Sequence, residues 1–445
     1  MTKTRILIAA PTSGCGKTTV TMGLLRALRK RGIDVQPFKC GPDYIDTKWQ
    51  TLAAGRPSVN LDPWMLCDGD LKDTCEHYSQ EAQATLTEGA MGLFDGYEKW
   101  HGSAAEVAML TEAHIVLVVD ARSAAFSVAA TILGTDTLLR KIGAEEGLAG
   151  VIFNKVGSAS HCTFLAEACQ EADVRCLGFL PRADSISLPS RHLGLTIDAC
   201  YQADTFLEQV ASFMEEHVDI DMLLDICTDK NEYECTRCAP LPVYADDMLI
   251  PGMTIPKGGR IALAHDDAFN FCYERNEDLL RSAGHEVVYF SPLNDDPLPA
   301  GTALVYLPGG YPELHLKELE ENMKAKMSLR EYVEKGGRVY AECGGMLYLS
   351  QYIEDQNGER HQMAGILPLH ATFVGMHLHL GYRKMETDGR YWRGHEFHYS
   401  EIHEDGAVER IGTQKSARGK ETRTAIYKYK NVVAGYTHFT FGGKK

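Results

Sequence analysis

The sequence has no long hydrophobic segment. Its longest apolar runs, such as Ile115–Val119, are far shorter than the roughly 20 residues that a membrane-spanning helix needs. Residues 1–5 lead directly into a strand-like run, Ile6–Ala10, so we expect no secretory signal. These absences predict a cytoplasmic protein that makes no use of a membrane.

The sequence also lacks an excess of positive charge. It has 45 Lys and Arg against 61 Asp and Glu, a net charge of −16, which argues against nucleic acid as a partner. A local loop can still bind a small anion. Hydrophobic residues make up 44% and charged residues 24%, which excludes extensive disorder. The 13 cysteines are odd in number and scattered, so we expect reduced thiols and no disulfide framework.

The chain of 445 residues is long enough for about three domains. Short β-branched runs alternate with helical patterns, which predicts parallel sheets with helices on both faces. The fold class is therefore α/β, with two doubly wound, mainly parallel sheet domains joined by a linker. The expected strands are Arg5–Ala10, Val35–Phe38, Ile115–Asp120, Gly150–Asn154 and Cys176–Phe179, then Arg260–Ala264, Glu286–Phe290, Ala303–Leu307 and Arg338–Ala341.

A polar, proline-containing stretch interrupts this alternation after about residue 222. We expect an N-terminal domain at residues 1–225, a linker at 226–258 and a C-terminal domain at 259–445. The alternative is that the linker separates two halves of a single large sheet.

Residues 11–19 form a small-residue loop between an expected strand and an expected helix at Thr18–Arg31. This is the setting of a P-loop, in which backbone N–H groups converge on phosphate oxygens. Lys17 would reach the β- and γ-phosphates and Thr18 would place its hydroxyl on Mg²⁺. Pro11 stands where the strict motif has its first glycine. The residues expected to bind ATP are Ser13, Gly14, Cys15, Gly16, Lys17, Thr18 and Thr19.

Two acidic loops should lie beside this P-loop. Residues 39–46 follow the second strand, where Asp43 and Asp46 could hold Mg²⁺ or organise a substrate. Residues 87–96 place Glu88 where P-loop enzymes carry a metal-binding carboxylate. Each loop alone would as readily be a solvated turn or a helix cap. Together with the P-loop they predict an ATP–Mg²⁺ site.

The C-terminal half contains a candidate nucleophile. Cys343 follows the strand Arg338–Ala341 and precedes a helical pattern, a sharp turn that exposes a thiol near a helix N-terminus. Gly344 would supply one oxyanion N–H and Gly310, in the loop 307–313, a second. His438 is the predicted base. The alternative for Cys343 alone is a buried inert thiol.

Three further groups have the spacing of metal ligands. The pairs His377-x-His379 and His395-x-x-His398 fit a core or substrate role equally well. Cys235 and Cys238, with Cys227 nearby, offer three thiolates without a clear fourth ligand. We do not expect a metal at any of these three groups.

An ATP site and a Cys/His amidase-like site have a joint chemistry, in which ammonia from glutamine amidates a phosphorylated carboxylate. The sequence closely resembles the cobyrinic acid a,c-diamide synthase family over nearly its whole length. The segments that show the resemblance are residues 12–19, 41–46, 60–65, 88–96, 189–195, 266–273, 308–313 and 394–400. The segment at 41–46, Gly-Pro-Asp-Tyr-Ile-Asp, argues against the sister cobyric acid synthase.

The resemblance implies a dethiobiotin-synthetase-like N-terminal domain and a class I glutaminase-like C-terminal domain. It further implies amidation of the a- and c-acetates of a corrinoid, with ATP and Mg²⁺. Thr18, Asp46 and Glu88 would bind the metal. The residues expected to face the substrate are Lys39, Asp43, Tyr44, Asp95, Arg191 and His192.

The sequence leaves open the third member of the triad, the identity of the ring and the class of activity. Class I glutaminases usually place Glu two residues after the base, but this position is Thr440, so the third triad member is unassigned. The ring could be nickel-sirohydrochlorin or hydrogenobyrinic acid instead of cobyrinic acid. A P-loop regulatory ATPase with a glutaminase relic is an alternative of another class. A homodimer is compatible with the sequence.

Overall fold

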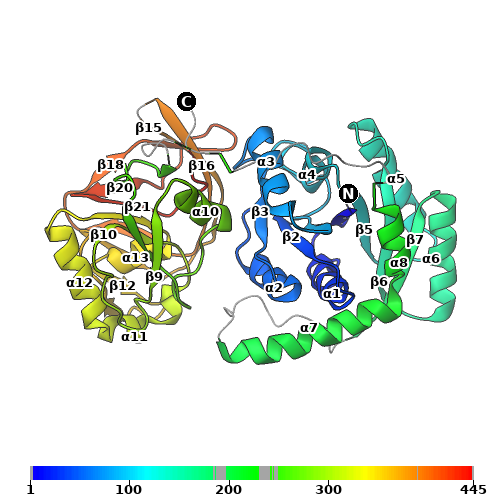
Figure 1. The fold of residues 1–445 in the computed structure, drawn as a ribbon, viewed down its shortest axis with the longest axis horizontal. Coiled ribbons are helices and arrows are strands. Elements are labelled where there is room, and N and C mark those ends of the chain that lie inside the picture. Colours follow the sequence, from blue (N-terminus) through cyan, green and yellow to red (C-terminus); the bar gives the residue numbers. More distant parts are fainter. Residues whose placement is uncertain are drawn as a thin grey trace. The chain divides into compact units, whose positions relative to one another are not determined.

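The computed structural model describes residues 4–183, 186, 197–229, 241–242, 244, 249–387 and 389–442. The chain forms two compact units, Met1–Pro240 and Leu241–Lys445, which carry separate sheets (Figure 1). The predicted alternative of one large sheet is therefore wrong for the described strands. The finer boundaries at 225 and 258 stay a prediction.

Unit 1, Met1–Pro240, is built on a parallel seven-stranded sheet with the order β3-β2-β4-β1-β5-β6-β7. All the strands predicted for this half are confirmed. The strands are β1 (Thr4–Ala9), β2 (Val35–Cys40), β3 (Val59–Leu61), β4 (Ala84–Glu88), β5 (His114–Asp120), β6 (Leu148–Val156) and β7 (Arg175–Pro181).

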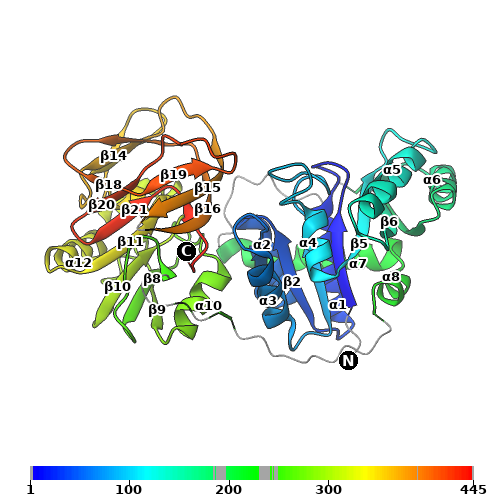
Figure 2. The ribbon, with the colours of Figure 1, turned by 90° about the horizontal axis from the view of Figure 1, so that it is seen from above.

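Helices cover both faces of this sheet (Figure 2). Alternate residues of β1 enter two different hydrophobic clusters, Ile6 and Ile8 in one and Leu7 and Ala9 in the other. A strand buried on both faces reads as a continuous apolar run, which is why β1 was predictable. The helices are α1 (Lys17–Lys30), α2 (Ile45–Ala54), α3 (Asp68–Ser79), α4 (Ala104–Thr111), α5 (Val128–Lys141), α6 (Ala159–Glu171), α7 (Ile197–His217) and α8 (Ile220–Ile226).

Unit 2, Leu241–Lys445, contains a second seven-stranded sheet with the order β18-β20-β21-β11-β10-β8-β9. Its five strands from β9 to β21 are parallel, and β20 and β18 are antiparallel additions at one edge. The strands are β8 (Arg260–Ala264), β9 (Glu286–Phe290), β10 (Thr302–Leu307), β11 (Arg338–Glu342), β18 (Glu409–Ile411), β20 (Ile426–Tyr429) and β21 (Val432–Gly435). The helices are α10 (Glu274–Ser282), η2 (Pro312–Leu314), α11 (Leu316–Glu321), α12 (Met323–Glu334) and α13 (Gly344–Leu349).

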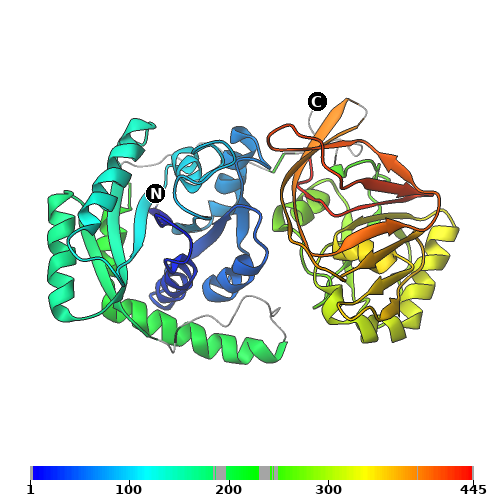
Figure 3. The ribbon, with the colours of Figure 1, turned by 180° about the vertical axis from the view of Figure 1, so that it is seen from behind.

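Unit 2 also has two four-stranded sheets that the sequence analysis did not predict. One contains β12 (Tyr352–Glu354), β13 (Arg360–Gln362), β14 (Leu369–Thr372) and β17 (Glu401–Glu404). The other contains β15 (His379–Thr387), β16 (Arg390–His398), β19 (Thr413–Ser416) and β22 (His438–Phe439). The strands from β15 onward are orange to red in Figure 3, colours that they share with β18, β20 and β21 of the seven-stranded sheet. The second of these sheets matters for function because β16 pairs with β22, which carries His438.

Candidate active sites

The P-loop of unit 1 connects β1 to α1. Gly14 and Gly16 have φ angles of +82° and +98°, a region that glycine adopts without strain. A Cβ at Gly16 would also clash with the amide of Asn154, whose Nδ2 donates a 2.9 Å hydrogen bond to the Cys15 carbonyl. The end of β6 therefore supports the loop. The predicted residues from Ser13 to Thr19 all lie in this loop or in the first turn of α1.

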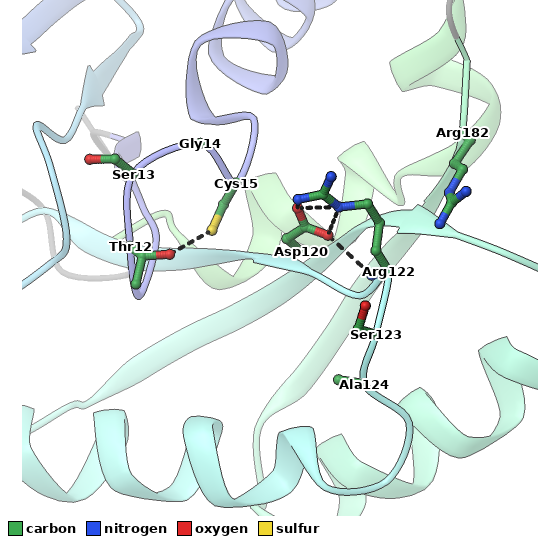
Figure 4. Close-up of a pocket in the computed structure, with 9 residues that line it drawn as sticks. All are labelled: Thr12, Ser13, Gly14, Cys15, Asp120, Arg122, Ser123, Ala124 and Arg182. Carbon is green, nitrogen blue, oxygen red and sulfur yellow. Dashed lines mark hydrogen bonds and ion pairs between the residues drawn. The ribbon is translucent and has the colours of Figure 1, made fainter.

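A cavity of about 510 Å³ lies beside the P-loop, large enough for a nucleotide (Figure 4). Its side opposite the loop is formed by the segment after β5, where the Asp120 carboxylate binds Arg122 and, at 2.9 Å, Lys155 Nζ. These three residues were not predicted from the sequence. Only their positions could have indicated them. Asp120 ends β5, Arg122 follows it, and Lys155 is the next-to-last residue of β6, so all three lie at the carboxyl ends of parallel strands. The lining residues are Thr12, Ser13, Gly14, Cys15, Asp120, Arg122, Ser123, Ala124 and Arg182.

A buried polar cluster adjoins the P-loop. Thr18 Oγ1 donates a 2.7 Å hydrogen bond to Glu88 Oε1, and Gln50 Nε2 donates one of the same length to Glu88 Oε2. Lys39 Nζ lies 2.7 Å from Asp46 Oδ2 and 3.0 Å from Glu88 Oε1. The three residues predicted to bind metal, Thr18, Asp46 and Glu88, are thus brought together.

This cluster fits Mg²⁺ by its donor types. It offers one hydroxyl and two carboxylates, the hard oxygen ligands that Mg²⁺ prefers. In this structure the ammonium of Lys39 lies between the two carboxylates and compensates their charge. Burial raises the pKa of Glu88, and Lys39 lowers it. Mg²⁺ binding would require Lys39 to shift toward another anion, such as a phosphate or a substrate carboxylate.

The remaining residues of unit 1 that were predicted to face the substrate lie less close together than those of the buried polar cluster. Asp43 Oδ1 accepts the backbone N–H groups of Ile45 and Asp46, both at 2.8 Å, and so begins α2. Asp95 Oδ2 accepts the Gly92 N–H at 2.9 Å and closes its own loop. Tyr44, which follows Asp43 in the chain, is half-buried. Arg191 and His192 lie outside the described residues.

Cys343 of unit 2 occupies a strained turn between β11 and α13. Its φ of +43° and ψ of −109° are unfavourable for a residue with a side chain. The backbone around it is tightly packed, since a Cβ at Gly344 would lie 3.1 Å from the Gly310 nitrogen and 2.8 Å from Pro312 Cδ. The two N–H groups predicted to form an oxyanion hole, those of Gly310 and Gly344, therefore belong to segments in close contact.

The Cys343 thiol is buried, so the exposed position expected from the sequence is wrong, and its environment favours the neutral form. Burial raises the pKa of Cys343 above its ordinary value, the charge of Glu313 raises it further, and the Gly344 N–H lowers it. A base is therefore needed to form the thiolate. Glu313 itself is affected by burial, which raises its pKa to about 7.

His438 on β22 lies at the same corner of the sheet. A Cβ at Gly309 would clash with its imidazole, so the ring packs directly on the backbone that leads to Gly310. The Cys343 N–H donates a 2.7 Å hydrogen bond to the Gly435 carbonyl, three residues before His438. Burial, together with the smaller effects of His395 and His398, lowers the pKa of His438 to about 3. A neutral imidazole is the form that can accept a proton.

Glu342 is the residue of this site that sequence reasoning missed. Its side chain is 2% exposed, and Oε2 lies 3.9 Å from His438 Nδ1. Thr440, the position of the usual triad carboxylate, instead donates its hydroxyl to the Arg393 carbonyl at 3.0 Å. The available signal was a charged residue at the carboxyl end of β11, after the apolar residues 339–341 and directly before the candidate nucleophile.

The histidine pairs do not form a metal site in the described part of the chain. His379 and His398 stack with ring centroids 4.8 Å apart, and His398 stacks on Tyr436 at 3.5 Å. The one group of three ligands close enough for a metal, among the residues described, is Asp355, Glu359 and His361 at the β12–β13 turn. Cys235 and Cys238 lie outside the described residues, and Cys227 is buried.

Two protein families match the chain, one in each unit. Residues 6–195 match the CobQ/CobB/MinD/ParA nucleotide binding domain. Residues 260–445 match the CobB/CobQ-like glutamine amidotransferase domain. No described helix is long and apolar enough to cross a membrane.

Full-length relatives extend this likeness over almost the entire chain. The hydrogenobyrinate a,c-diamide synthase of Brucella suis biovar 1 (strain 1330) is 39% identical over 439 residues, which cover 97% of each chain. The cobyrinate a,c-diamide synthase of Salmonella typhimurium (strain LT2) is 38% identical over 448 residues, 98% of this chain and 94% of the relative. That of Dehalococcoides mccartyi is 36% identical over 453 residues, 98% and 95% of the two chains.

A nucleotide-binding domain joined to a glutamine amidotransferase domain defines a glutamine-dependent amidating ligase. Within that class, the chain belongs to the a,c-diamide synthase family.

Proposed function

We propose that this chain converts the a- and c-acetate carboxylates of cobyrinic acid to amides, with ATP as phosphoryl donor and glutamine as nitrogen donor. In unit 2, the Cys343 thiol would attack the glutamine amide, which expels ammonia and leaves a glutamyl thioester. Water would then hydrolyse the thioester to glutamate and the free thiol. In unit 1, each substrate carboxylate would take the γ-phosphoryl group of ATP, giving an acyl phosphate and ADP. Ammonia then displaces phosphate and forms the amide.

The observation that carries this proposal is the presence, in one chain, of a phosphate loop beside buried carboxylates and of a cysteine turn beside a buried neutral histidine. Lys17 and the loop N–H groups would hold the triphosphate. Mg²⁺, bound by Thr18, Asp46 and Glu88, would neutralise charge on the phosphates. Lys39 is the buried cation nearest to that metal position, and it would contact the reacting carboxylate or phosphate.

The identity of the ring rests on the relatives, whose names include both cobyrinate and hydrogenobyrinate. Their identities to this chain, 39% and 38%, support both rings about equally. Nickel-sirohydrochlorin is a third substrate of the same chemistry, and the motifs alone do not separate the three.

The test combines enzyme, ATP, Mg²⁺ and glutamine with each of these rings separately, followed by the mass of the product. We expect a loss of about two mass units with cobyrinic acid, since each conversion of a carboxyl to an amide removes about one. Hydrogenobyrinic acid and nickel-sirohydrochlorin serve as matched alternatives. Turnover of ATP and glutamine without a mass change in any ring would favour a regulatory ATPase with a glutaminase relic.

A further inference from the structure

Glu342 lies between the elements that hold the candidate nucleophile and the candidate base. It is the last residue of β11 and immediately precedes Cys343. Its Oε1 accepts the backbone N–H of Phe439 at 3.0 Å, and Phe439 immediately follows His438 on β22. Its Oε2 lies 3.9 Å from His438 Nδ1. One side chain therefore joins two segments that lie about a hundred residues apart in the sequence.

The carboxylate is held rigidly in this place. Tyr340 donates its hydroxyl to Oε1 at 2.8 Å, and Tyr306 donates its hydroxyl to Oε2 at 2.9 Å. Both tyrosines are buried, as is Glu342. A buried carboxylate is costly unless hydrogen bonds satisfy it, and three donors do so here. Within the described residues, His438 is the one basic side chain at ion-pair distance from Glu342.

We propose that Glu342 is the positioning residue for His438 and completes the nucleophile–base system that Thr440 cannot complete. It would fix β22 through the Phe439 N–H and give the imidazole a negatively charged neighbour. That charge stabilises the imidazolium formed when His438 takes the proton of the Cys343 thiol. The inference rests on the proposed roles of Cys343 and His438.

The electrostatics of the site give this role a pH signature. Burial raises the pKa of Glu342 to about 7, although the hydrogen bonds from Phe439, Tyr340 and Tyr306 oppose the rise. The carboxyl group therefore becomes a carboxylate as the pH increases through about 7. Because only the carboxylate stabilises an imidazolium, kcat/KM for glutamine should rise over this range.

Other titratable groups surround the three residues and must be separated from Glu342. His395 and His398 face His438, and Glu313 and Glu396 face Cys343. Tyr306, Tyr340 and Cys272 face Glu342. Glu313 is the main competitor, since its pKa is also about 7.

The experiment compares wild type, Glu342→Gln, Glu342→Asp, Glu313→Gln and Tyr340→Phe as full-length enzymes. Gln keeps an acceptor for the Phe439 N–H but removes the charge. We expect Glu342→Gln to lower kcat/KM for glutamine by at least about 100-fold and to abolish its rise near pH 7. Amidation with added ammonium should be retained. The rate of Cys343 alkylation by iodoacetamide should lose the same pH dependence. Tyr340→Phe removes a hydrogen bond that lowers the pKa of Glu342, so it should keep the rise in kcat/KM but move it to higher pH.

Several outcomes would overturn the inference. One is a wild-type pH profile in Glu342→Gln, or a profile that only Glu313→Gln abolishes. Another is equal loss of glutamine- and ammonium-dependent activity with a lower Tm, which would make Glu342 merely structural. If Glu342→Gln does not fold, Glu342→Asp should keep the pH dependence at a reduced kcat, and loss of that dependence would count against the role. Glutaminase activity that survives Cys343→Ala would instead refute the proposed site itself.

Discussion

The ammonium of Lys39 compensates the negative charge of the buried carboxylates of Asp46 and Glu88 in unit 1. Its ammonium lies within 3.0 Å of Glu88 and 2.7 Å of Asp46, and all three side chains are almost inaccessible to solvent. Removal of one partner from a buried ion pair costs about 3–5 kcal/mol, because the other charge is left without compensation.

We therefore predict that Lys39→Met lowers the free energy of unfolding by about 3–5 kcal/mol in the absence of divalent cations. Urea titration followed by circular dichroism measures this. Mg²⁺ should restore much of the loss, since a bound divalent cation would compensate the same carboxylates. Lys72→Met, at an exposed position of α3, is the matched control. Wild-type stability of Lys39→Met in the absence of divalent cations would show that Lys39 does not compensate the charge of these carboxylates.

At the scale of residues, the sequence predicts best what depends on local context. Lys17, Thr18 and Cys343 follow directly from a strand, a turn and a helix that are neighbours in the chain. The role inferred for Glu342 depends on β22 lying beside β11, a contact across about a hundred residues that no local pattern records. Asp43 and Asp95 were predicted to face metal or substrate, and hydrogen bonds to nearby backbone N–H groups account for part of their local role.

The segment between β10 and η2 shows how one element shapes the glutaminase-like site. The Gly309 carbonyl accepts the N–H groups of Asn270 and Phe271, both at 3.0 Å, which ties this segment to the loop after β8. On its other side the imidazole of His438 fills the space that a Cβ would need. The segment therefore tolerates no side chain at position 309.

We predict that Gly309→Ala displaces His438 and lowers kcat/KM for glutamine by about 100-fold, the size expected for a displacement of roughly 1 Å at a reacting group. Steady-state glutaminase assays measure this, and the ammonium-dependent reaction should change little. Gly134→Ala on α5, where a Cβ would meet open space, is the control. An unaffected glutaminase activity would show that the imidazole has room to move without consequence.

At the scale of elements, the parallel strands were predictable because burial on both faces produces short apolar runs. The strands of the two additional sheets were missed because they are half-exposed and rich in polar and charged residues. β15 and β16 show this, since they pair over their full length yet contain Arg, Lys, Glu and His at many positions. Their place in the fold is determined by pairing partners rather than by local hydrophobicity.

The net charge of −16 bears on the whole molecule and its substrates. ATP and a polycarboxylate ring are both anionic, so the overall field opposes their approach, and binding must rely on local cations and backbone N–H groups. We predict that kcat/KM for the ring substrate rises about twofold between about 0.01 and 0.15 M salt, as the Debye length falls from about 30 to 8 Å. Initial rates at constant free Mg²⁺ measure this, and a steep fall would instead indicate attraction by an extended basic surface.

The two units should also divide the labour. Cys343→Ala should abolish the use of glutamine but leave amidation with ammonium, because the nucleophile acts only on glutamine. Lys17→Ala should abolish amidation with either nitrogen source, at a cost in transition-state stabilisation of several kcal/mol. Product formation from ammonium and from glutamine is measured for each variant. Full activity in Lys17→Ala would move the nucleotide site away from the P-loop.

The most direct test of the central claim follows the amide nitrogen of glutamine into the ring. The enzyme is given ATP, Mg²⁺, cobyrinic acid and either ordinary or amide-¹⁵N glutamine, and the product masses are compared. We expect a diamide about two mass units heavier with the labelled donor, and no diamide from Cys343→Ala under the same conditions. Products of equal mass from the two donors, or no amidated ring from either, would contradict it.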